Sequence, residues 1–261
     1  MSNPLLSPGD PDPVIAVNPG GASAFLLLGD HAGRAIPRRL GDLGLPPHEL
    51  GRHIAWDIGV AALGDRLASA LDAAFLRQVY SRLVIDCNRR PDAADAAPGI
   101  SAGTLIPGNA GLSAADLAAR RAAIYAPYHD HIATVLNERA ALGRQTALIC
   151  LHSFTPVFGG VPRPWRFGVL HRGDSALSLR MLTLLRTAVG EAVGDNQPYA
   201  MDTVDNTVPL HADPRGLDYL ELEVRQDLIA DEAGQADVAA LLAELLPQAL
   251  PHARARPPSR P

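Results

Sequence analysis

The sequence predicts an α/β fold in which a sheet is covered by helices on both faces. Apolar runs that end in small or polar residues, at positions 24–28 and 147–151, are typical of strands buried on both sides. Between them lie longer segments with apolar residues at helical spacing, such as 60–71. Strands and helices that alternate along a chain usually form a sheet with helices packed against it.

The chain has 261 residues, of which 47% are hydrophobic, enough to bury the core of one large domain. No composition change marks a linker, so we expect a single domain over residues 1–261. Its ends, 1–20 and 250–261, are rich in proline and are expected to be poorly ordered. A net charge of −5 without a long basic run argues against nucleic-acid and membrane partners. No protein partner follows from the sequence.

The first residues lack the pattern of a signal peptide, and no apolar run approaches the roughly 20 residues of a membrane span. We therefore expect a cytoplasmic protein. Both cysteines, Cys87 and Cys150, lie in apolar runs and are expected to be buried thiols, not a disulfide or a metal cluster. The chain contains no lysine, which excludes Schiff-base chemistry and a Walker phosphate loop.

The first third of the chain predicts three strands and a long helix. The strand at 24–28 is followed by a loop and by a proline-marked helix start at 46–50. Residues 60–71 have apolar residues at helical spacing and no proline, and therefore form a helix. The apolar runs 75–79 and 83–87 are both interpreted as strands.

A long loop follows, because Pro91 ends any regular element. A loop of the length of 92–112 in a compact domain is more often a lid or binding loop than a simple connection. Ser113 begins a capping-box pattern, so a helix is expected over 113–142, with a kink at Pro127.

The rest of the chain again alternates strands and helices. Residues 147–151 and 165–170 are apolar runs expected to form strands, and 175–189 has helical spacing. Apolar and polar residues alternate over 217–225, which indicates another strand. An amphipathic helix at 237–246 closes the domain.

Two histidines follow apolar runs: His31 lies just beyond the first strand, and His152 directly after the strand at 147–151. Ligands of open α/β sheets bind at the carboxyl ends of the strands. Catalytic zinc takes three ligands from histidine and carboxylate and keeps a fourth position for water. The pair therefore predicts two ligands of a metal site, although a single such histidine is more often a hydrogen-bonded structural residue.

Three acids are candidates for the third ligand, and Asp57 is preferred. Asp30 neighbours His31 on an extended chain, so its side chain points to the opposite face. Glu223 suits a different role, because a metal-dependent hydrolase needs a carboxylate base near the water. The alternative for Asp57 is a helix-capping residue, since it precedes the helix at 60–71.

Asn88 and Arg89 follow another predicted strand and could bind a substrate carboxylate, because a guanidinium matches a carboxylate with two hydrogen bonds. Arg82 could supply a second positive charge. The alternative is a surface ion pair with Asp86 or Asp92.

Apart from Asp57, the candidate site residues named so far lie in segments that together resemble the N-formylglutamate amidohydrolase family. The resemblance covers about residues 24–229, in order. The segments are DHAGRAIP at 30–37, YSRLVIDCNRRP at 80–91, LIPGN at 105–109, HSFTP at 152–156, RPW at 163–165 and EVRQDLI at 223–229.

This resemblance implies a three-layer sandwich with a mixed, mostly parallel sheet, like that of zinc carboxypeptidases and aspartoacylases. It implies a zinc-dependent hydrolase of a linear amide, acting on an N-acyl amino acid such as N-formylglutamate. Those enzymes have an Asn-Arg pair after a strand and a glutamate in a strand that reads Glu-apolar-Arg. Asn88-Arg89 and Glu223-Val224-Arg225 look like these two features. The carboxypeptidase motif has a glutamate three residues after its histidine, where this chain has Arg34, so Asp57 is not carried over from it.

The resulting hypothesis assigns a role to each candidate residue. Glu223 is the catalytic base. The divalent metal, expected to be zinc, is held by His31, Asp57 and His152, and the small-molecule substrate is bound by Arg82, Asn88, Arg89, His211 and Arg215. His211 and Arg215 are candidates for stabilising the oxyanion or binding a second carboxylate.

Three other functions are weighed against this one. A serine hydrolase would use Ser153 or Ser81, but the sequence lacks a Gly-x-Ser-x-Gly elbow. A carboxylate-binding module without catalysis would have the same fold and bind without turnover. Nucleotide binding is disfavoured, because the glycines of the segment 18–21 precede the first strand instead of following it.

Overall fold

A mixed sheet of seven strands forms the centre of the computed structural model, which describes residues 5–201 and 205–250. In spatial order the strands are β1 (Val14–Val17), β3 (Ala74–Gln78), β2 (Phe25–Gly29), β6 (Ala147–Phe154), β11 (Tyr219–Arg225), β9 (Phe167–Leu170) and β10 (Val193–Asp195). The four central strands, β3, β2, β6 and β11, are parallel. At one side β1 is antiparallel to β3, and at the other β9 is antiparallel to β11 and parallel to β10.

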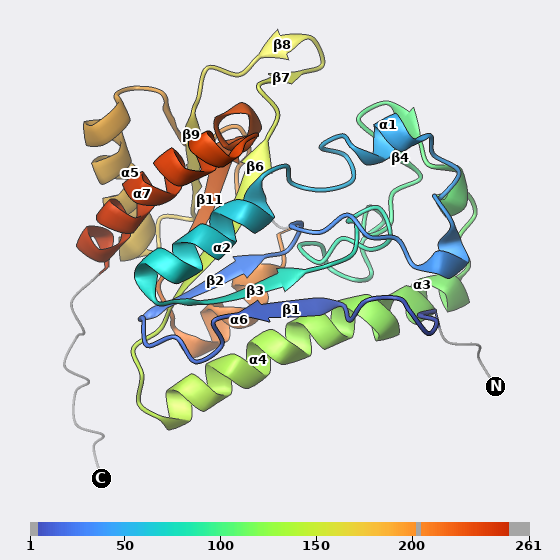
Figure 1. The fold of residues 1–261 in the computed structure, drawn as a ribbon, viewed down its shortest axis with the longest axis horizontal. Coiled ribbons are helices and arrows are strands. Elements are labelled where there is room, and N and C mark those ends of the chain that lie inside the picture. The colour runs from blue at the N-terminus through green and yellow to red at the C-terminus, as the bar shows by residue number, and fades with distance from the viewer. Residues whose placement is uncertain (1–4, 202–204, 251–261) are drawn as a thin grey trace.

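Helices cover both faces of this sheet, which confirms the predicted three-layer arrangement. On one face lie α2 (Val60–Leu71), α5 (Ala176–Val189) and α7 (Glu232–Ala249), and on the other lie α4 (Ala126–Ala141) and α6 (Thr207–His211) (Figure 1). Successive strand residues supply the two cores: Leu27 packs with the α2, α5 and α7 side, and Leu28 with the α4 and α6 side.

The remaining elements lie outside the three layers. They are the helices α1 (Pro47–Leu50) and α3 (Ala114–Arg120), the hairpin β4 (Ile100–Ser101) and β5 (Thr104–Leu105), and the hairpin β7 (Val157–Phe158) and β8 (Val161–Pro162). The β7–β8 hairpin projects from the body of the domain (Figure 1). Across the described ranges, no helix combines the length and the apolar character that crossing a membrane requires.

Several predicted elements agree with the structure. The helix at 60–71 is α2 with the same bounds. The long helix at 113–142 is present as α3 and α4, joined by a turn of π-helix at Arg121–Tyr125. The π-helical turn ends two residues before Pro127, which has no amide hydrogen to donate within the helix. The helix is therefore irregular next to the proline at which a kink was expected.

Other expectations were wrong. Residues 83–87 form turns, not a strand, because both edges of β3 are already paired with β1 and β2; the run is apolar because it fills the second core. Val14–Val17, in the segment expected to be poorly ordered, forms the edge strand β1. The short strand β10 was also missed. The expected disorder at 251–261 falls outside the described residues.

Candidate metal centre and active site

A cavity of about 280 Å³ opens where the parallel central strands end. His31 lies in the turn after β2, and His152 lies inside β6, which extends beyond the predicted end of that strand to Phe154. Glu223 lies on β11, and Arg82 follows β3. All four residues line the cavity. The carboxyl edge of the sheet thus gathers side chains that are far apart in sequence.

Three buried side chains, His31, Asp57 and His152, meet in this cavity. One potential ligand atom from each lies within 4.8 Å of the other two. The Oδ2 atom of Asp57 is 3.5 Å from Nδ1 of His31 and 3.0 Å from Nδ1 of His152. The backbone holds Asp57 in place, since its amide donates to the carbonyl oxygen of His31 over 2.9 Å. Asp57 is not the capping residue of α2, because Gly59 occupies that position.

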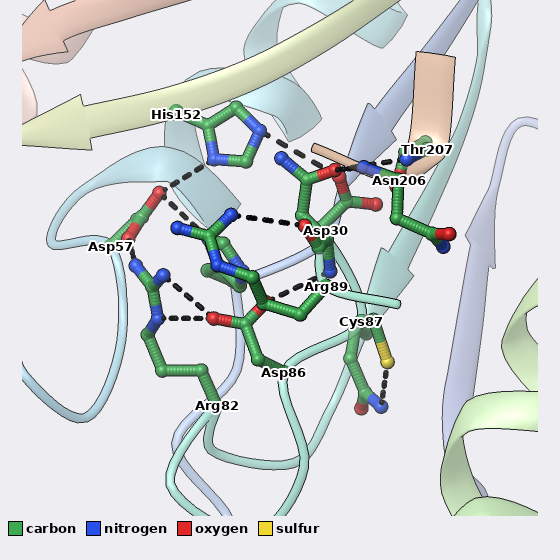
Figure 2. Close-up of polar contacts among 12 residues, drawn as sticks. Asp30, Asp57, Arg82, Asp86, Cys87, Arg89, His152, Asn206 and Thr207 are labelled. Atoms are coloured by element: carbon green, nitrogen blue, oxygen red, sulfur yellow. Dashed lines mark hydrogen bonds and ion pairs between the residues drawn. The ribbon is translucent and has the colours of Figure 1, made fainter. Parts of the chain in front are cut away.

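Each of the two imidazoles also faces a second carboxylate with its other nitrogen. Nε2 of His31 is 2.7 Å from Oδ1 of Asp86. Nε2 of His152 is 3.6 Å from Oδ2 of Asp30, and Figure 2 shows His152 between Asp57 and Asp30. Carboxylates in this position orient histidine ligands of metals and leave the opposite nitrogen free for the ion.

The donor set fits a divalent metal ion. A carboxylate only accepts hydrogen bonds, so the short contact with Asp86 assigns the proton of His31 to Nε2. Nδ1 of His31 is then an acceptor, and it is buried without a hydrogen-bond partner beside the Asp57 carboxylate. Positive charge between these two acceptors, from a metal ion or from a proton on Nδ1, removes their repulsion. Two imidazole nitrogens and one carboxylate oxygen are a typical ligand set for zinc.

Electrostatics in this cluster also favour positive charge. Burial and the Arg82 guanidinium lower the pKa of His31, but the Asp86 and Asp57 carboxylates outweigh them and raise it overall. For His152, burial is again outweighed, here by Asp30 and Asp57, and its pKa is raised well above its usual value. The surrounding carboxylates thus stabilise a cation at this position.

Glu223 is placed beside His152 by the sheet itself. The two residues are direct partners in the register of β6 and β11, so their side chains leave the sheet on the same face. Glu223 is 6% exposed, and its Oε2 atom has no hydrogen-bond partner. Burial raises the pKa of Glu223 to about 7. A carboxyl group with this pKa can both accept and donate a proton near neutral pH.

Two of the three arginines predicted to bind substrate, Arg82 and Arg89, line the cavity, and both already contact carboxylates. Arg82 contacts Asp86 through Nε at 3.0 Å and Nη2 at 2.7 Å, an ion pair that the sequence had offered as the alternative. Arg89 contacts Asp95 at 3.1 Å and Asp205 at 3.5 Å. The second alternative partner, Asp92, pairs with Arg90 instead.

Asn88 lines the cavity, but its side-chain amide is hydrogen-bonded to other residues of the protein. Its Oδ1 atom accepts hydrogen bonds from the backbone amides of Asn206 and Thr207, at the start of α6. Its Nδ2 atom is 3.4 Å from Asp205. Asn88 therefore ties the segment before α6 to the edge of the cavity.

His211 and Arg215 do not line the cavity, contrary to the role expected for them. Nε2 of His211 is 2.9 Å from Nδ1 of His129, a residue of α4. Arg215 donates to the carbonyl oxygen of His211 and to the side chain of Asn137. Sequence order suggested a place at the site because both precede β11, but the chain enters that strand at its amino end, away from Glu223.

Several residues of the site were missed or given another role. Asp86 is hydrogen-bonded to His31, Asp30 faces His152, and Glu221, Asp205 and Tyr199 line the cavity. Glu221 could have been found, because it lies two residues before Glu223 on a strand and so faces the same side. Asp205 and Tyr199 carry no comparable signal, because neither lies in a helix or in a strand of the sheet.

The serines of the alternative mechanism are occupied elsewhere. The Ser153 hydroxyl donates to the carbonyl oxygen of Ile58, and the Ser81 hydroxyl donates to that of Ala55. Within the described parts of the chain, neither hydroxyl has a hydrogen bond to a histidine, so the arrangement of a serine nucleophile with its base is not found.

Comparisons with known proteins show which fold and family this chain shares. The structure of gene product Atu2144 from Agrobacterium tumefaciens is 39% identical, with a TM-score of 0.90 over 94% of this chain and 97% of that one. N-formylglutamate amidohydrolase from Ralstonia eutropha JMP134 shares the fold, at 20% identity and a TM-score of 0.66 over 91% of this chain and 97% of that one. No curated protein matches the chain significantly. The sequence pattern of one family matches residues 23–230, and the chain belongs to that family, the N-formylglutamate amidohydrolases.

Proposed function

We propose that this protein is a metal-dependent hydrolase that cleaves the amide bond of an N-formyl or N-acyl amino acid such as N-formylglutamate. Membership of an amidohydrolase family supports the reaction class. The observation that carries the metal dependence is the buried group of His31, Asp57 and His152, with the unpartnered Glu223 carboxyl in the same cavity.

His31, Asp57 and His152 would hold a divalent metal, zinc by their chemistry. When bound there, zinc polarises a carbonyl and lowers the pKa of water from about 15.7 toward 7. Asp86 accepts the Nε2 proton of His31 and so directs the Nδ1 lone pair of that residue at Asp57. Asp30 faces Nε2 of His152 over 3.6 Å, so it would favour a proton on that nitrogen and leave Nδ1 for the ion.

Glu223 moves the proton of the reaction. Its carboxylate accepts a proton from the attacking water, and the protonated acid then donates that proton to the nitrogen of the breaking amide bond. The products are the free amine and the carboxylate of the acyl group. The raised pKa of Glu223 suits both steps, because the ideal pKa of a group that acts as acid and base lies near the working pH.

Arg82 and Arg89 would bind the substrate carboxylate at the rim of the cavity. Each guanidinium already has carboxylate neighbours, which hold it in a defined orientation, and each retains further N–H donors. Asn88 supports this edge through its hydrogen bonds to the start of α6. Fixing the carboxylate in this way would position the amide bond over the metal ligands.

The first test is a panel of N-formyl and N-acetyl amino acids, assayed with the protein as purified, after chelation and after zinc is restored. We expect release of formate or acetate that chelation abolishes and zinc restores. Ligand binding with no hydrolysis of any member of the panel would contradict the proposal and favour a binding module. Hydrolysis that chelation leaves unchanged would contradict the metal dependence.

A Glu223→Gln substitution tests the proton transfer separately from metal binding. We expect the variant to retain zinc and to lose about 10²–10⁴-fold in kcat, because a positioned general base contributes rate enhancements of this order. Metal analysis and steady-state kinetics on the same preparation check both. Normal turnover by the variant would mean that another group is the base.

A further inference from the structure

A second cavity adjoins the one that contains the proposed metal ligands. It has a volume of about 460 Å³ and extends to the β4–β5 hairpin, where Ile100 forms part of its wall. Four side chains line both cavities: His53, Arg82, Arg89 and Tyr199. A ligand that extends outward from Glu223 and the metal ligands would therefore pass these four residues.

Of these four side chains, only His53 is without a hydrogen bond in the described ranges of the chain. It lies in the turns between α1 and α2, is partly buried, and has its Nε2 atom buried without a partner. Buried polar atoms of folded proteins are usually hydrogen-bonded, so an unpartnered imidazole in the wall of a cavity points to a ligand. A neutral imidazole offers that ligand one N–H donor.

The charges around His53 define the kind of ligand. Burial lowers the pKa of His53, and three nearby guanidinium groups lower it further, those of Arg52, Arg163 and Arg82. The Asp57 carboxylate opposes these effects without outweighing them. The imidazole is therefore neutral near pH 7 and lies among positive charges, which attract an anion and repel a cation.

Arg163 is the one of these three arginines that forms no ion pair with a carboxylate of the described residues, whereas the other two do. Its guanidinium carbon lies 4.8 Å from the ring centroids of both Phe158 and Tyr199, and it donates to the Tyr199 hydroxyl over 3.1 Å. Phe158 is also edge-on to the His53 ring, with 6.4 Å between the centroids. A positive charge without a carboxylate partner and an imidazole without a hydrogen bond thus meet at Phe158.

We propose that His53, with the charge of Arg163 beside it, binds the side-chain carboxylate of an acidic N-acyl amino acid. This inference rests on the proposed function and refines it. Arg82 and Arg89 serve the α-carboxylate, which is bonded to the same carbon as the amide nitrogen. The side-chain carboxylate lies farther from the amide bond and would reach the place where the two cavities join. A hydrogen bond from the imidazole N–H to this carboxylate is charge-assisted and would select an acidic side chain over a neutral one.

Binding of free amino acids tests this assignment without requiring turnover. Isothermal titration of the zinc-loaded protein compares L-glutamate with L-glutamine, which has nearly the same shape but a neutral side chain. We expect the wild type to bind L-glutamate about tenfold or more tightly, because a hydrogen bond to a charged group contributes a factor of this order. Equal affinities for the two amino acids would overturn the inference.

Variants of His53 assign the preference to this residue. His53→Leu removes the donor, so the preference should fall to about threefold or less through weaker binding of L-glutamate alone. His53→Asn keeps an N–H donor and should retain most of the preference. His48→Leu is the control, because His48 is an exposed histidine of α1 that lines neither cavity. An unchanged preference in His53→Leu, or an equal loss in the leucine and asparagine variants, would contradict the hydrogen bond.

The contribution of Arg163 is tested in the same titration. Arg163→Met removes its charge and should reduce the preference for L-glutamate, whereas Arg163→Lys keeps the charge and should retain it. Equal preferences in the methionine variant and the wild type would exclude a role for this charge.

The hydrolysis panel separates this inference from the proposed function. If L-glutamate is preferred through His53 but no N-acyl amino acid is cleaved, the subsite stands and the hydrolase proposal fails. If N-formylglutamate is cleaved and His53→Leu keeps the full preference, the hydrolase proposal stands and the subsite fails.

Discussion

Asp30 is the neighbour of one proposed metal ligand, yet its side chain reaches the other. Its Oδ1 atom accepts a hydrogen bond from the Tyr128 hydroxyl over 2.7 Å, and its Oδ2 atom faces Nε2 of His152. The side chain is 0% exposed. Rejecting Asp30 as a ligand because it points away from His31 agrees with this position. From this geometry we propose that Asp30 positions His152.

An Asp30→Asn substitution should weaken zinc binding about 10–100-fold. The asparagine amide no longer favours a proton on Nε2 of His152, so the Nδ1 lone pair is no longer reserved for the metal. Tyr128→Phe, which removes only the hydrogen bond to Asp30, should have a smaller effect. Competition with a chromophoric chelator measures both, with Tyr125→Phe as a control, because the Tyr125 hydroxyl contacts Asn206 instead. If the Asp30 variant binds zinc as tightly as the wild type, Asp30 does not position His152 for the metal.

Arg89 and Arg90 are adjacent arginines in very different surroundings, which makes them a matched pair. Arg89 lines the cavity, whereas Arg90 is exposed and pairs with Asp92. Arg89→Ala should raise KM for the substrate about 10–100-fold, the effect of losing a charge-assisted hydrogen bond. Arg90→Ala should leave KM within about twofold. Equal KM values in the two variants would leave the proposed carboxylate receptor without support.

At the scale of elements, the pairing of β6 with β11 decides which groups meet. In parallel strands a register shift of one residue would turn either Glu223 or His152 to the opposite face of the sheet. The observed register places Glu221 and Glu223 beside Cys150 and His152, and all four face the cavity side. The catalytic proposal thus depends on the register of this strand pair.

The contact between α4 and α6 contains two buried histidines that predict an acid sensitivity of the fold. Burial, with His129 nearby, lowers the pKa of His211 to about 3, and burial also lowers that of His129. Above the unfolded pKa of about 6.5 these histidines are neutral in both states, so their contribution to stability is complete. Below it the unfolded chain binds protons that the folded chain does not, so stability falls between about pH 6.5 and 3.

His211→Gln should reduce this acid sensitivity. Urea unfolding at pH 7 and pH 5 should show a loss of stability in the wild type that exceeds the loss in the variant by about 1–2 kcal/mol. Glutamine can keep the donor to His129 but does not titrate. His131→Gln, at an exposed position of α4, is the control and should behave like the wild type. Equal losses in the wild type and the His211 variant would contradict this origin of the acid sensitivity.

At the scale of the whole molecule, the proposed metal ligands connect three parts of the chain. His31 follows β2, Asp57 precedes α2, and His152 lies in β6, so a bound ion would join the sheet to the layer of α2. An ion that binds only the folded state stabilises it by mass action, by about 4 kcal/mol at a thousandfold excess over Kd.

Removing the metal should therefore lower the melting temperature. For a domain of this size we expect a decrease of about 10 °C on chelation, reversed by zinc. Thermal unfolding followed by circular dichroism measures it. A His152→Ala variant should bind less zinc and lose its response to chelator. A wild-type melting temperature that chelator does not change, together with full zinc content in the His152 variant, would exclude this site.

Local pattern determined much of this protein: the buried strands, helix α2, the histidines at the edge of the sheet and the family segments all follow from residue type and spacing. Tertiary structure alone decided the rest. The apolar run 83–87 could not be distinguished from a strand, because burial and strand pairing have the same pattern in sequence. Folding also decides the surroundings of three acids. It brings Asp86 to His31 and Asp30 to His152, and it buries Glu221 with one oxygen unpartnered. The sequence does not show this, because the charge and solvation of a side chain depend on the residues that surround it.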